Sequence, residues 1–210
     1  MILIMETISK QKAIQILIQN NISILDISTA QKIFSFKKEN SLYKFLQRLE
    51  RADILKRIVK GKYLFSFKEI NDYELANFLL APSYISLESA LSFYGILAQF
   101  PYTITSVTTS KTRKIIYNEK EFEFAHLRRE NFFGFVKKDN FLIAQPEKAL
   151  LDELYFVSKG LISISLNELN LSLINKNKLL EMMQYYKFLP LENMVKKYVI
   201  ENRYKYFPKN

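Results

Sequence analysis

The chain has 210 residues, a length that suits two small domains, and 49% of its residues are hydrophobic, enough to bury real cores. The absence of cysteine excludes disulfides, thiolate nucleophiles and cysteine-based zinc sites, and a single histidine argues against histidine-rich metal sites and histidine-based triads. No apolar run approaches the roughly 20 residues that a membrane-spanning helix needs. The composition therefore predicts a soluble cytoplasmic protein.

The formal net charge of +10 is unevenly distributed along the chain. Residues 1–70 contain 13 Lys or Arg and 6 Asp or Glu, a balance of +7, whereas residues 71–210 contain 18 and 15, a balance of +3. One third of the chain thus carries most of the imbalance. Such a concentration of positive charge indicates an anionic partner, such as nucleic acid, for the N-terminal part.

Three helices are predicted in residues 1–70. Residues 9–20 carry apolar residues at helical spacing after Ser9, which can act as the N-cap. A short second helix follows, capped by Asp26 or Ser28. Asn40 can cap a third helix over 41–52, SLYKFLQRLERA.

The third helix has two contrasting faces. Its apolar residues follow an i, i+3, i+4, i+7 pattern that predicts one buried stripe: Leu42, Phe45, Leu46 and Leu49. The opposite face carries three cations and an amide: Lys44, Gln47, Arg48 and Arg51. Arg and Gln side chains can contact base edges through two hydrogen bonds, and Lys suits phosphate. An ordinary solvated helix face is the alternative interpretation.

Residues 55–65, LKRIVKGKYLF, alternate apolar and polar residues around Gly61 and predict a β-hairpin that carries four cations. Ile54, Ile58, Tyr63 and Phe65 are expected to cover the helices. Helix, short helix, cationic helix and basic hairpin is the order of a winged helix-turn-helix, whose third helix enters the major groove. We therefore expect DNA contacts from Ser41, Lys44, Gln47, Arg48, Arg51, Lys56, Arg57, Lys60 and Lys62.

Residues 71–210 predict a second domain, of α+β class, with a small, mostly antiparallel sheet and a helical C-terminus. Residues 71–80 resemble a connecting helix, and a further helix is capped by Ser86 and stopped by Gly95. Strands are expected over 102–109, 113–117 and 121–127, because these stretches are rich in β-branched and aromatic residues. A short strand then runs into a helix that begins at Pro146, and more helix is expected over 166–171, 176–187 and 190–205.

Catalytic chemistry is not visible in the sequence. Four glycines leave no room for a glycine-rich phosphate loop, and no cluster of metal-ligand residues is visible, so neither a cofactor nor a metal is expected. Glu147, Asp152 and Glu153 share one helix, and we interpret them as a solvated face, with a metal-dependent nuclease or a protein-modifying enzyme as the alternative. His126 is expected to be half-buried or exposed scaffold. The tail 196–210 mixes cations with aromatics and is interpreted as a docking amphipathic helix, with nucleic-acid binding as the alternative.

Three segments of the chain, in their order, resemble the AbiEi antitoxin family. They are GKYLF at 61–65, PSYISLESALSFYGIL at 82–97 and AQPEKALLDELY at 144–155. Gly61 and Tyr63 match the Gly-x-Tyr that closes its wing. The remaining matches are Ser86, Ser89, Ala90, Leu91, Tyr94 and Gly95 in one helix and Pro146 to Asp152 at the start of another. In the second domain, Ala90, Leu91, Tyr94 and the stretch 149–151 are expected to pack, and none of the motif residues is expected to be catalytic.

The resemblance implies a winged helix-turn-helix followed by an antitoxin domain, with a boundary near residue 70. It implies the antitoxin of a type IV toxin–antitoxin system in abortive phage infection, which represses its own promoter at inverted repeats. Its functional partner would be a nucleotidyltransferase-like toxin, without a stable complex. A stand-alone winged-helix regulator with a C-terminal interaction domain is the alternative.

Overall fold

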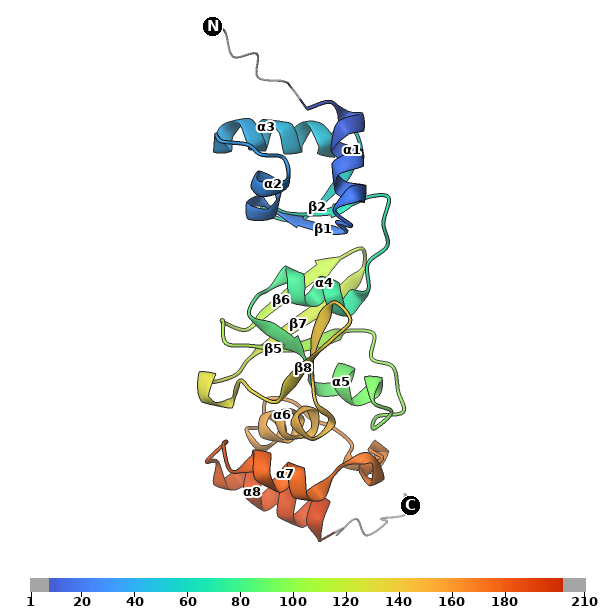
Figure 1. Cartoon of the computed structure of the whole chain (residues 1–210). Helices are drawn as coiled ribbons and strands as arrows, with labels where there is room; N and C mark the ends of the chain where they lie inside the picture. Colours follow the sequence, from blue (N-terminus) through green and yellow to red (C-terminus); the bar gives the residue numbers. More distant parts are fainter. Residues whose placement is uncertain (1–7, 202–210) are drawn as a thin grey trace, which may run out of the picture. The chain divides into compact units, whose positions relative to one another are not determined.

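The structure, a computed structural model, describes residues 8–201 of the chain, which divides into two compact units between Asn71 and Asp72 (Figure 1). Unit 1 comprises the described residues up to Asn71, and unit 2 comprises those from Asp72 onward. Helices and sheets occur in both units, so the chain belongs to the α+β class. No helix within residues 8–201 is both long and apolar enough to cross a bilayer.

Unit 1 consists of three helices and a three-stranded antiparallel sheet with the strand order β1-β3-β2. Its elements are α1 (Lys10–Gln19), β1 (Ile24–Asp26), α2 (Ile27–Ile33), α3 (Glu39–Glu50), β2 (Leu55–Val59) and β3 (Lys62–Phe65). The three helices and the hairpin were expected, whereas β1 was not. This strand pairs with β3 on the side away from β2 and extends the hairpin to three strands.

The N-terminal caps of the helices can be compared with those expected from the sequence. Ser9 accepts a hydrogen bond from the Lys12 backbone N–H at 3.1 Å, and Asp26 accepts one from Thr29 at 2.7 Å, so Asp26 and not Ser28 is the cap of α2. The expected cap of α3 at Asn40 is wrong. This helix begins at Glu39, because the Lys38 carbonyl already accepts the backbone N–H groups of residues 41 and 42, and no side chain caps it.

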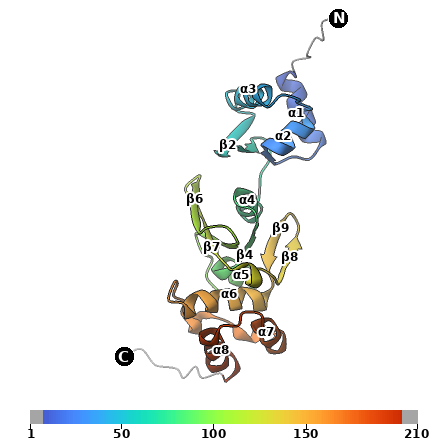
Figure 2. The ribbon, with the colours of Figure 1, turned by 90° about the vertical axis from the view of Figure 1, so that its left-hand side faces the viewer.

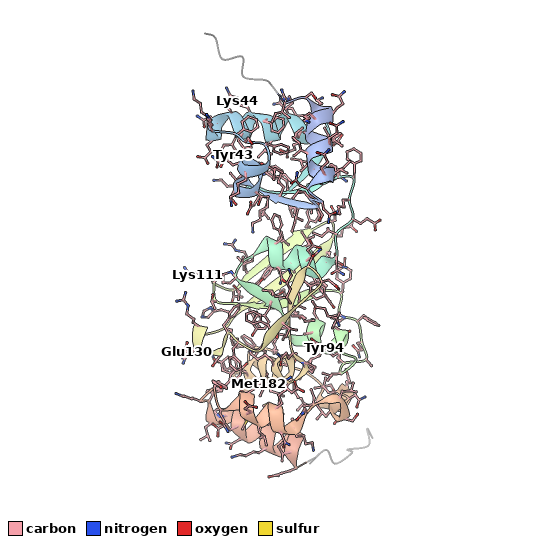
Figure 3. All side chains as sticks on the ribbon, in the orientation of Figure 1. Tyr43, Lys44, Tyr94, Lys111, Glu130 and Met182 are labelled. Carbon is pink, nitrogen blue, oxygen red and sulfur yellow. The ribbon has the colours of Figure 1, made fainter. Side chains whose placement is uncertain are left out.

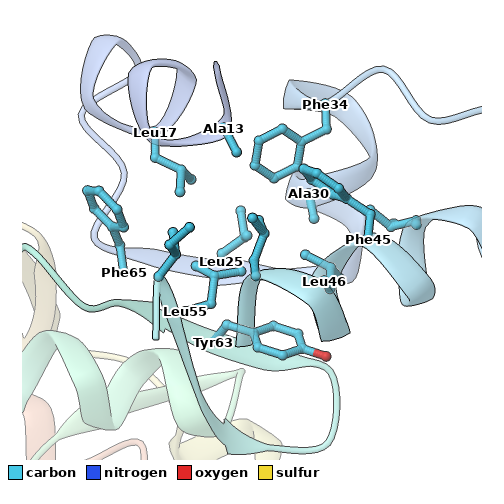
Figure 4. Close-up of a cluster of buried hydrophobic side chains, with 13 residues drawn as sticks. Ala13, Leu17, Leu25, Ala30, Phe34, Phe45, Leu46, Leu55, Tyr63 and Phe65 are labelled. Carbon is cyan, nitrogen blue, oxygen red and sulfur yellow. The ribbon is translucent and has the colours of Figure 1, made fainter. Parts of the chain in front are cut away.

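The core of unit 1 lies between the helices and the sheet (Figure 4). All four apolar residues of the predicted α3 stripe are buried, and Phe45 meets the ring of Phe34 edge-on at 4.9 Å. From the hairpin region, Ile54, Tyr63 and Phe65 are buried as expected, whereas Ile58 is only half-buried. The apolar stripe of α3 therefore fixes which face of this helix remains exposed.

Unit 2 contains a six-stranded mixed sheet with the order β6-β7-β5-β4-β9-β8. Its strands are β4 (Ser83–Ile85), β5 (Ile104–Thr108), β6 (Arg113–Tyr117), β7 (Lys120–His126), β8 (Phe135–Lys138) and β9 (Phe141–Ala144). The pairs β4–β9 and β5–β7 are parallel and the other three are antiparallel. Three of the five pairings are antiparallel, as expected, but the sheet is larger than predicted and mixed, because the unpredicted strands β4 and β8 enlarge it and two pairings are parallel.

Helices cover both faces of this sheet (Figure 2). α4 (Asp72–Leu79) lies against one face, and α5 (Leu87–Phe93) and α6 (Pro146–Ser158) lie against the other. α7 (Lys176–Met183) and α8 (Leu189–Val195) pack against α6 on its side away from the sheet. α6 is therefore enclosed between two layers, which determines the environment of its polar residues.

The helix ends of unit 2 agree with several expectations and correct others. Gly95, with φ of +70°, follows the end of α5, and Pro146 lies in the first turn of α6. The expected helix over 166–171 is two short 3-10 turns, Leu166–Glu168 and Leu171–Leu173, and α7 ends four residues before residue 187. Beyond α8, the π-helix η4 spans Lys196–Ile200, and residues 202–205 of the last expected helix lie outside the described residues, as does the end of the tail.

Candidate nucleic-acid interface and the buried charges of unit 2

The exposed face of α3 carries a row of polar side chains. Lys44, Gln47 and Arg51 are exposed and lie at i, i+3 and i+7, opposite the buried apolar stripe (Figure 3 labels Lys44). Lys44 and Arg51 form no ion pair with another described residue. Next to this row, Tyr43 donates its hydroxyl hydrogen bond to Glu39 at 3.0 Å, which holds both side chains along the helix. The row is thus available to a partner.

Arg48 does not belong to this row. Its side chain is half-buried, and Nη2 donates a hydrogen bond to the backbone carbonyl of Ile8 at 2.7 Å. Its guanidinium carbon lies 5.2 Å from the centroid of the Phe45 ring. Ser41 is also half-buried, in the first turn of α3. Arg48 therefore connects α3 to the segment before α1, and neither residue shares the exposure of Lys44, Gln47 and Arg51.

The hairpin presents three exposed cations, Lys56, Arg57 and Lys60. The fourth expected contact, Lys62, is half-buried opposite Asp26 in the register of β1 and β3. Burial lowers the pKa of the Lys62 ammonium, and the Asp26 carboxylate opposes this change. The cationic character of the hairpin is therefore concentrated on β2 and the turn.

The hairpin turn requires its glycine. Gly61 has a φ of +77°, and a Cβ atom at this position would lie 3.3 Å from Cγ1 of Ile27 at the start of α2. The turn is therefore fixed against α2.

Tyr63 on β3 is influenced by charges from two elements. Burial and the Glu50 carboxylate raise the pKa of the Tyr63 hydroxyl, and the Arg57 guanidinium lowers it. The hydroxyl therefore lies within electrostatic reach of both β2 and the last turn of α3.

We use the name α3–hairpin surface for two exposed groups taken together, which are the row on α3 and the cations of the hairpin: Lys44, Gln47, Arg51, Lys56, Arg57 and Lys60. Its five cations form no ion pair with the other described residues, so none is neutralised within unit 1. Both contributing elements are held by the same hydrophobic core. Cations on a rigid frame, with Gln and Arg among them, suit a polyanion with readable polar edges.

In unit 2 the structure corrects an expectation about charge. Glu147, Asp152 and Glu153 were interpreted as a solvated face, but all three are buried, at 4%, 0% and 0% exposure, and Lys148 is also fully buried. The reason is the enclosure of α6: β4 and the start of α5 cover it on one side, and the α7–α8 connection covers it on the other. The sequence of α6 alone suggests a solvated face, because the elements that cover this helix lie elsewhere in the chain.

Asp152 is the centre of a buried hydrogen-bond network. Its Oδ2 accepts from the Tyr84 hydroxyl at 3.0 Å and from the Ser86 hydroxyl at 2.8 Å. Its Oδ1 forms an ion pair with Lys148 and accepts from the Tyr186 hydroxyl. Lys148 also donates to the Tyr186 hydroxyl at 2.7 Å. The network thus joins β4, α5, α6 and the α7–α8 connection, and each of its five side chains forms a hydrogen bond within it.

The environment of Lys148 is largely aromatic. Its Nζ lies 5.1 Å from the ring centroids of Phe133 and Tyr186. Burial lowers the pKa of Lys148 while Asp152 opposes the change, and burial raises the pKa of the Tyr186 hydroxyl well above its usual value. Gly134 lies against the aliphatic stem, where a Cβ atom would be 3.1 Å from Lys148 Cγ. The Lys148 side chain is therefore enclosed by the rings of Phe133 and Tyr186 around its ammonium and by Gly134 along its aliphatic stem.

Glu153 and Glu147 differ in the partners of their carboxyl oxygens. Both carboxyl oxygens of Glu153 are buried without a hydrogen-bond partner among the described residues. Burial raises the pKa of Glu153 to about 8, and the carboxyl groups of Glu88 and Asp152 add to the effect. Glu147 instead accepts from the Asn175 backbone at 3.1 Å and pairs with Lys178 at 2.9 Å.

The motif serines of α5 have structural partners. Ser86 occupies the N-cap position of α5 as expected, but its hydroxyl binds Asp152 and not the helix end. Ser89 and Thr105 exchange two hydrogen bonds, at 3.0 and 2.8 Å, which join α5 to β5. Among the expected packing positions, Ala90, Leu91 and the stretch 149–151 are buried, whereas Tyr94 is half-buried. His126 is exposed, and its ring Nδ1 lies 2.9 Å from the Ser110 carbonyl oxygen.

A comparison with protein-family models gives no match to this chain, and a comparison with curated proteins gives no relative. In the part of the chain that the structure describes, no group of three or more His, Cys, Asp or Glu side chains is arranged to hold a metal ion.

Proposed function

We propose that this chain is a sequence-specific DNA-binding regulator whose unit 1 acts as a winged helix-turn-helix. The observation that carries the proposal is the α3–hairpin surface, where the exposed row of one helix and a cationic hairpin stand on one hydrophobic core without internal neutralisation. In this arrangement α3 is the recognition helix in the major groove, and the hairpin is the wing.

The residues of the α3–hairpin surface have separate roles in this proposal. Gln47 and Arg51 contact base edges, because their side chains can form paired hydrogen bonds with adenine and guanine respectively. Lys44 and the three exposed cations of the hairpin bind phosphates and set the register on the duplex. Arg48 and Ser41 support the recognition helix from within unit 1, and Lys62 supports the hairpin at its junction with β1.

The same proposal extends to regulation of a toxin. The ordered motifs that resemble the AbiEi family support an autorepressor that also counteracts a nucleotidyltransferase-like toxin. Expression of the chain together with the product of the adjacent gene tests this part: growth should be restored, without stable co-purification of the two proteins. Persistent growth arrest would restrict the proposal to DNA binding.

The DNA-binding proposal is tested by titrating the full chain with the fragment upstream of its own gene and with a scrambled fragment, at two salt concentrations. We expect preference for the native fragment by about tenfold or more at both salts. Gln47→Ala and Arg51→Ala should each weaken binding to the native fragment by about 1–3 kcal/mol and relax the preference. Lys12→Ala, on the exposed side of α1, is the matched control. Equal, salt-sensitive binding of both fragments would refute a sequence-specific regulator.

A further inference from the structure

Unit 2 contains a small pocket that the proposed DNA-binding function does not use. It has a volume of about 230 Å³ and lies between the 3-10 helix Arg129–Asn131, the end of α6 and the α7–α8 connection. Six of its lining residues carry the argument: Arg128, Glu130, Lys159, Tyr185, Lys187 and Phe188. Figure 3 labels Glu130 at the edge of unit 2.

The pocket has an excess of positive charge. Arg128, Lys159 and Lys187 line it against one carboxylate, Glu130. None of the three cations forms an ion pair with another described residue. Lys159 is oriented by the Tyr155 hydroxyl, to which its Nζ donates at 3.2 Å, and two of its N–H groups remain for a ligand. Three cations that converge on a concave site favour a compact anion such as a phosphate group.

An exposed aromatic ring borders these cations. Tyr185 is 59% exposed, and its ring centroid lies 5.0 Å from that of the partly buried Phe133. Phe188 lies 5.4 Å from Tyr155 in an edge-on arrangement, which holds the pocket floor in place. A tyrosine that is supported from behind and open in front is a platform on which a planar ring can stack.

The third feature is an exposed acceptor. Glu130 lines the pocket, is exposed, and forms no ion pair with another described residue. Its carboxylate oxygens offer acceptors for hydroxyl or amino groups, the donors that sugars and bases carry.

From these three features we propose that the pocket binds a single nucleotide unit. Its phosphate lies against Arg128, Lys159 and Lys187, its base stacks on Tyr185, and its sugar hydroxyl or base amino groups donate to Glu130. A volume of about 230 Å³ limits the occupant to one nucleotide. The nucleotide is either free or the terminal unit of a single strand, since both carry the same chemistry.

Equilibrium dialysis of the full chain against the four nucleoside 5′-monophosphates, inorganic phosphate and adenosine tests the proposal. At least one monophosphate should bind saturably and more tightly than phosphate or adenosine alone. Arg128→Glu should weaken that binding by about 10- to 100-fold, because it replaces a charge-assisted hydrogen bond with repulsion. Tyr185→Ala should weaken nucleotide binding and leave phosphate binding unchanged. Arg129→Glu, the exposed neighbour that does not line the pocket, is the matched control.

The source of the nucleotide is decided with a five-nucleotide single strand, offered to the variant Lys56→Ala/Arg57→Ala/Lys60→Ala so that the hairpin does not contribute. Tighter binding of the strand than of any monophosphate, abolished by Arg128→Glu, assigns a strand end; equal or weaker binding assigns a free nucleotide. The proposal is overturned if no monophosphate binds saturably, or if Arg128→Glu and Arg129→Glu have the same effect while both variants retain the thermal stability of the parent. Either failure leaves the DNA titration of unit 1 unaffected.

Discussion

Arg48 shows how a single side chain can serve the fold at a position where sequence spacing suggests recognition. Its hydrogen bond to the Ile8 carbonyl and its contact with the Phe45 ring are both intramolecular. We expect Arg48→Ala to lower the free energy of unfolding by about 1–3 kcal/mol, through the lost charge-assisted bond and the lost packing of the aliphatic stem. Urea unfolding followed by circular dichroism measures this change.

Arg51→Ala is the control for this substitution, because Arg51 is exposed on the same helix. Its effect on stability should remain within about 0.5 kcal/mol, while its effect on DNA binding should be the larger of the two. If Arg48→Ala left stability unchanged and abolished the preference for the upstream fragment, Arg48 would have to leave Ile8 and contact bases, and its assignment as a support residue would be wrong.

Glu153 gives the protein a specific pH dependence. Its pKa is about 8 in the folded chain against 4.5 in the absence of burial, so between these values the folded state binds a proton that the unfolded state has released. Stability must then decrease as pH rises through this window, by up to about 1.4 kcal/mol per pH unit from this group. Above pH 8 the contribution is constant.

Glu153→Gln removes this dependence, because the amide has the same shape and no charge. The difference in unfolding free energy between variant and parent should be small near pH 5 and should favour the variant increasingly up to pH 8. Chemical denaturation across this range measures it, with Glu181→Gln on the exposed side of α7 as control. A difference that does not vary with pH would mean that Glu153 is already ionised and solvated in the folded chain.

At the scale of elements, α6 is held by the ion pair of Lys148 and Asp152. Each charge is buried and neutralised only by the other, so Lys148→Met or Asp152→Asn alone should cost about 3–5 kcal/mol. The double variant should cost less than the sum of the two, because no uncompensated charge remains. The partly exposed pair of Glu147 and Lys178 is the comparison, and its coupling should be at most about 1 kcal/mol. Equal couplings for both pairs would contradict the enclosure of α6.

The elements that sequence reasoning predicts well are those whose signals are local. The stripe and exposed row of α3, the hairpin glycine and the Pro146 start of α6 each depend on residues within one or two turns. The strands β4 and β8 were missed because they are short and are defined by their partners. β4 has three residues and pairs with β5 and β9, which lie about 20 and 60 positions further along the chain.

The residues of the candidate sites also divide into those with a local sequence signal and those whose role depends on a distant partner. Lys44, Gln47 and Arg51 were predictable because helical spacing alone separates them from the apolar stripe, whereas the Arg48 contact depends on Ile8, 40 residues away. The buried charges of α6 could not be predicted, since a Lys and an Asp four residues apart look like an exposed helix pair. The signal that was present is the abundance of Tyr: Tyr84 and Tyr186 provide the hydroxyls that make this burial possible.

At the scale of the whole molecule, the uneven charge determines how salt acts on DNA binding. Residues 1–70 carry a balance of +7 out of the total of +10, and the hairpin holds three exposed cations that bind phosphates in the proposed complex. Each phosphate contact releases condensed counterions, so each lost contact should reduce the slope of log K against log salt by about 0.9. For Lys56→Ala/Arg57→Ala/Lys60→Ala we therefore expect a slope smaller by about 2–3, alike for native and scrambled fragments.

The control for this measurement is Lys111→Ala in unit 2, which removes one exposed positive charge between β5 and β6 (Figure 3). Because counterion release depends on contacts with phosphates and not on net charge as such, this variant should retain the parental slope. A slope that decreases equally with any removed cation would mean that binding follows the total charge of the chain. A slope that decreases with the hairpin cations and not with Lys111 would assign phosphate contacts to the wing, and it would leave the preference between fragments to Gln47 and Arg51 of α3.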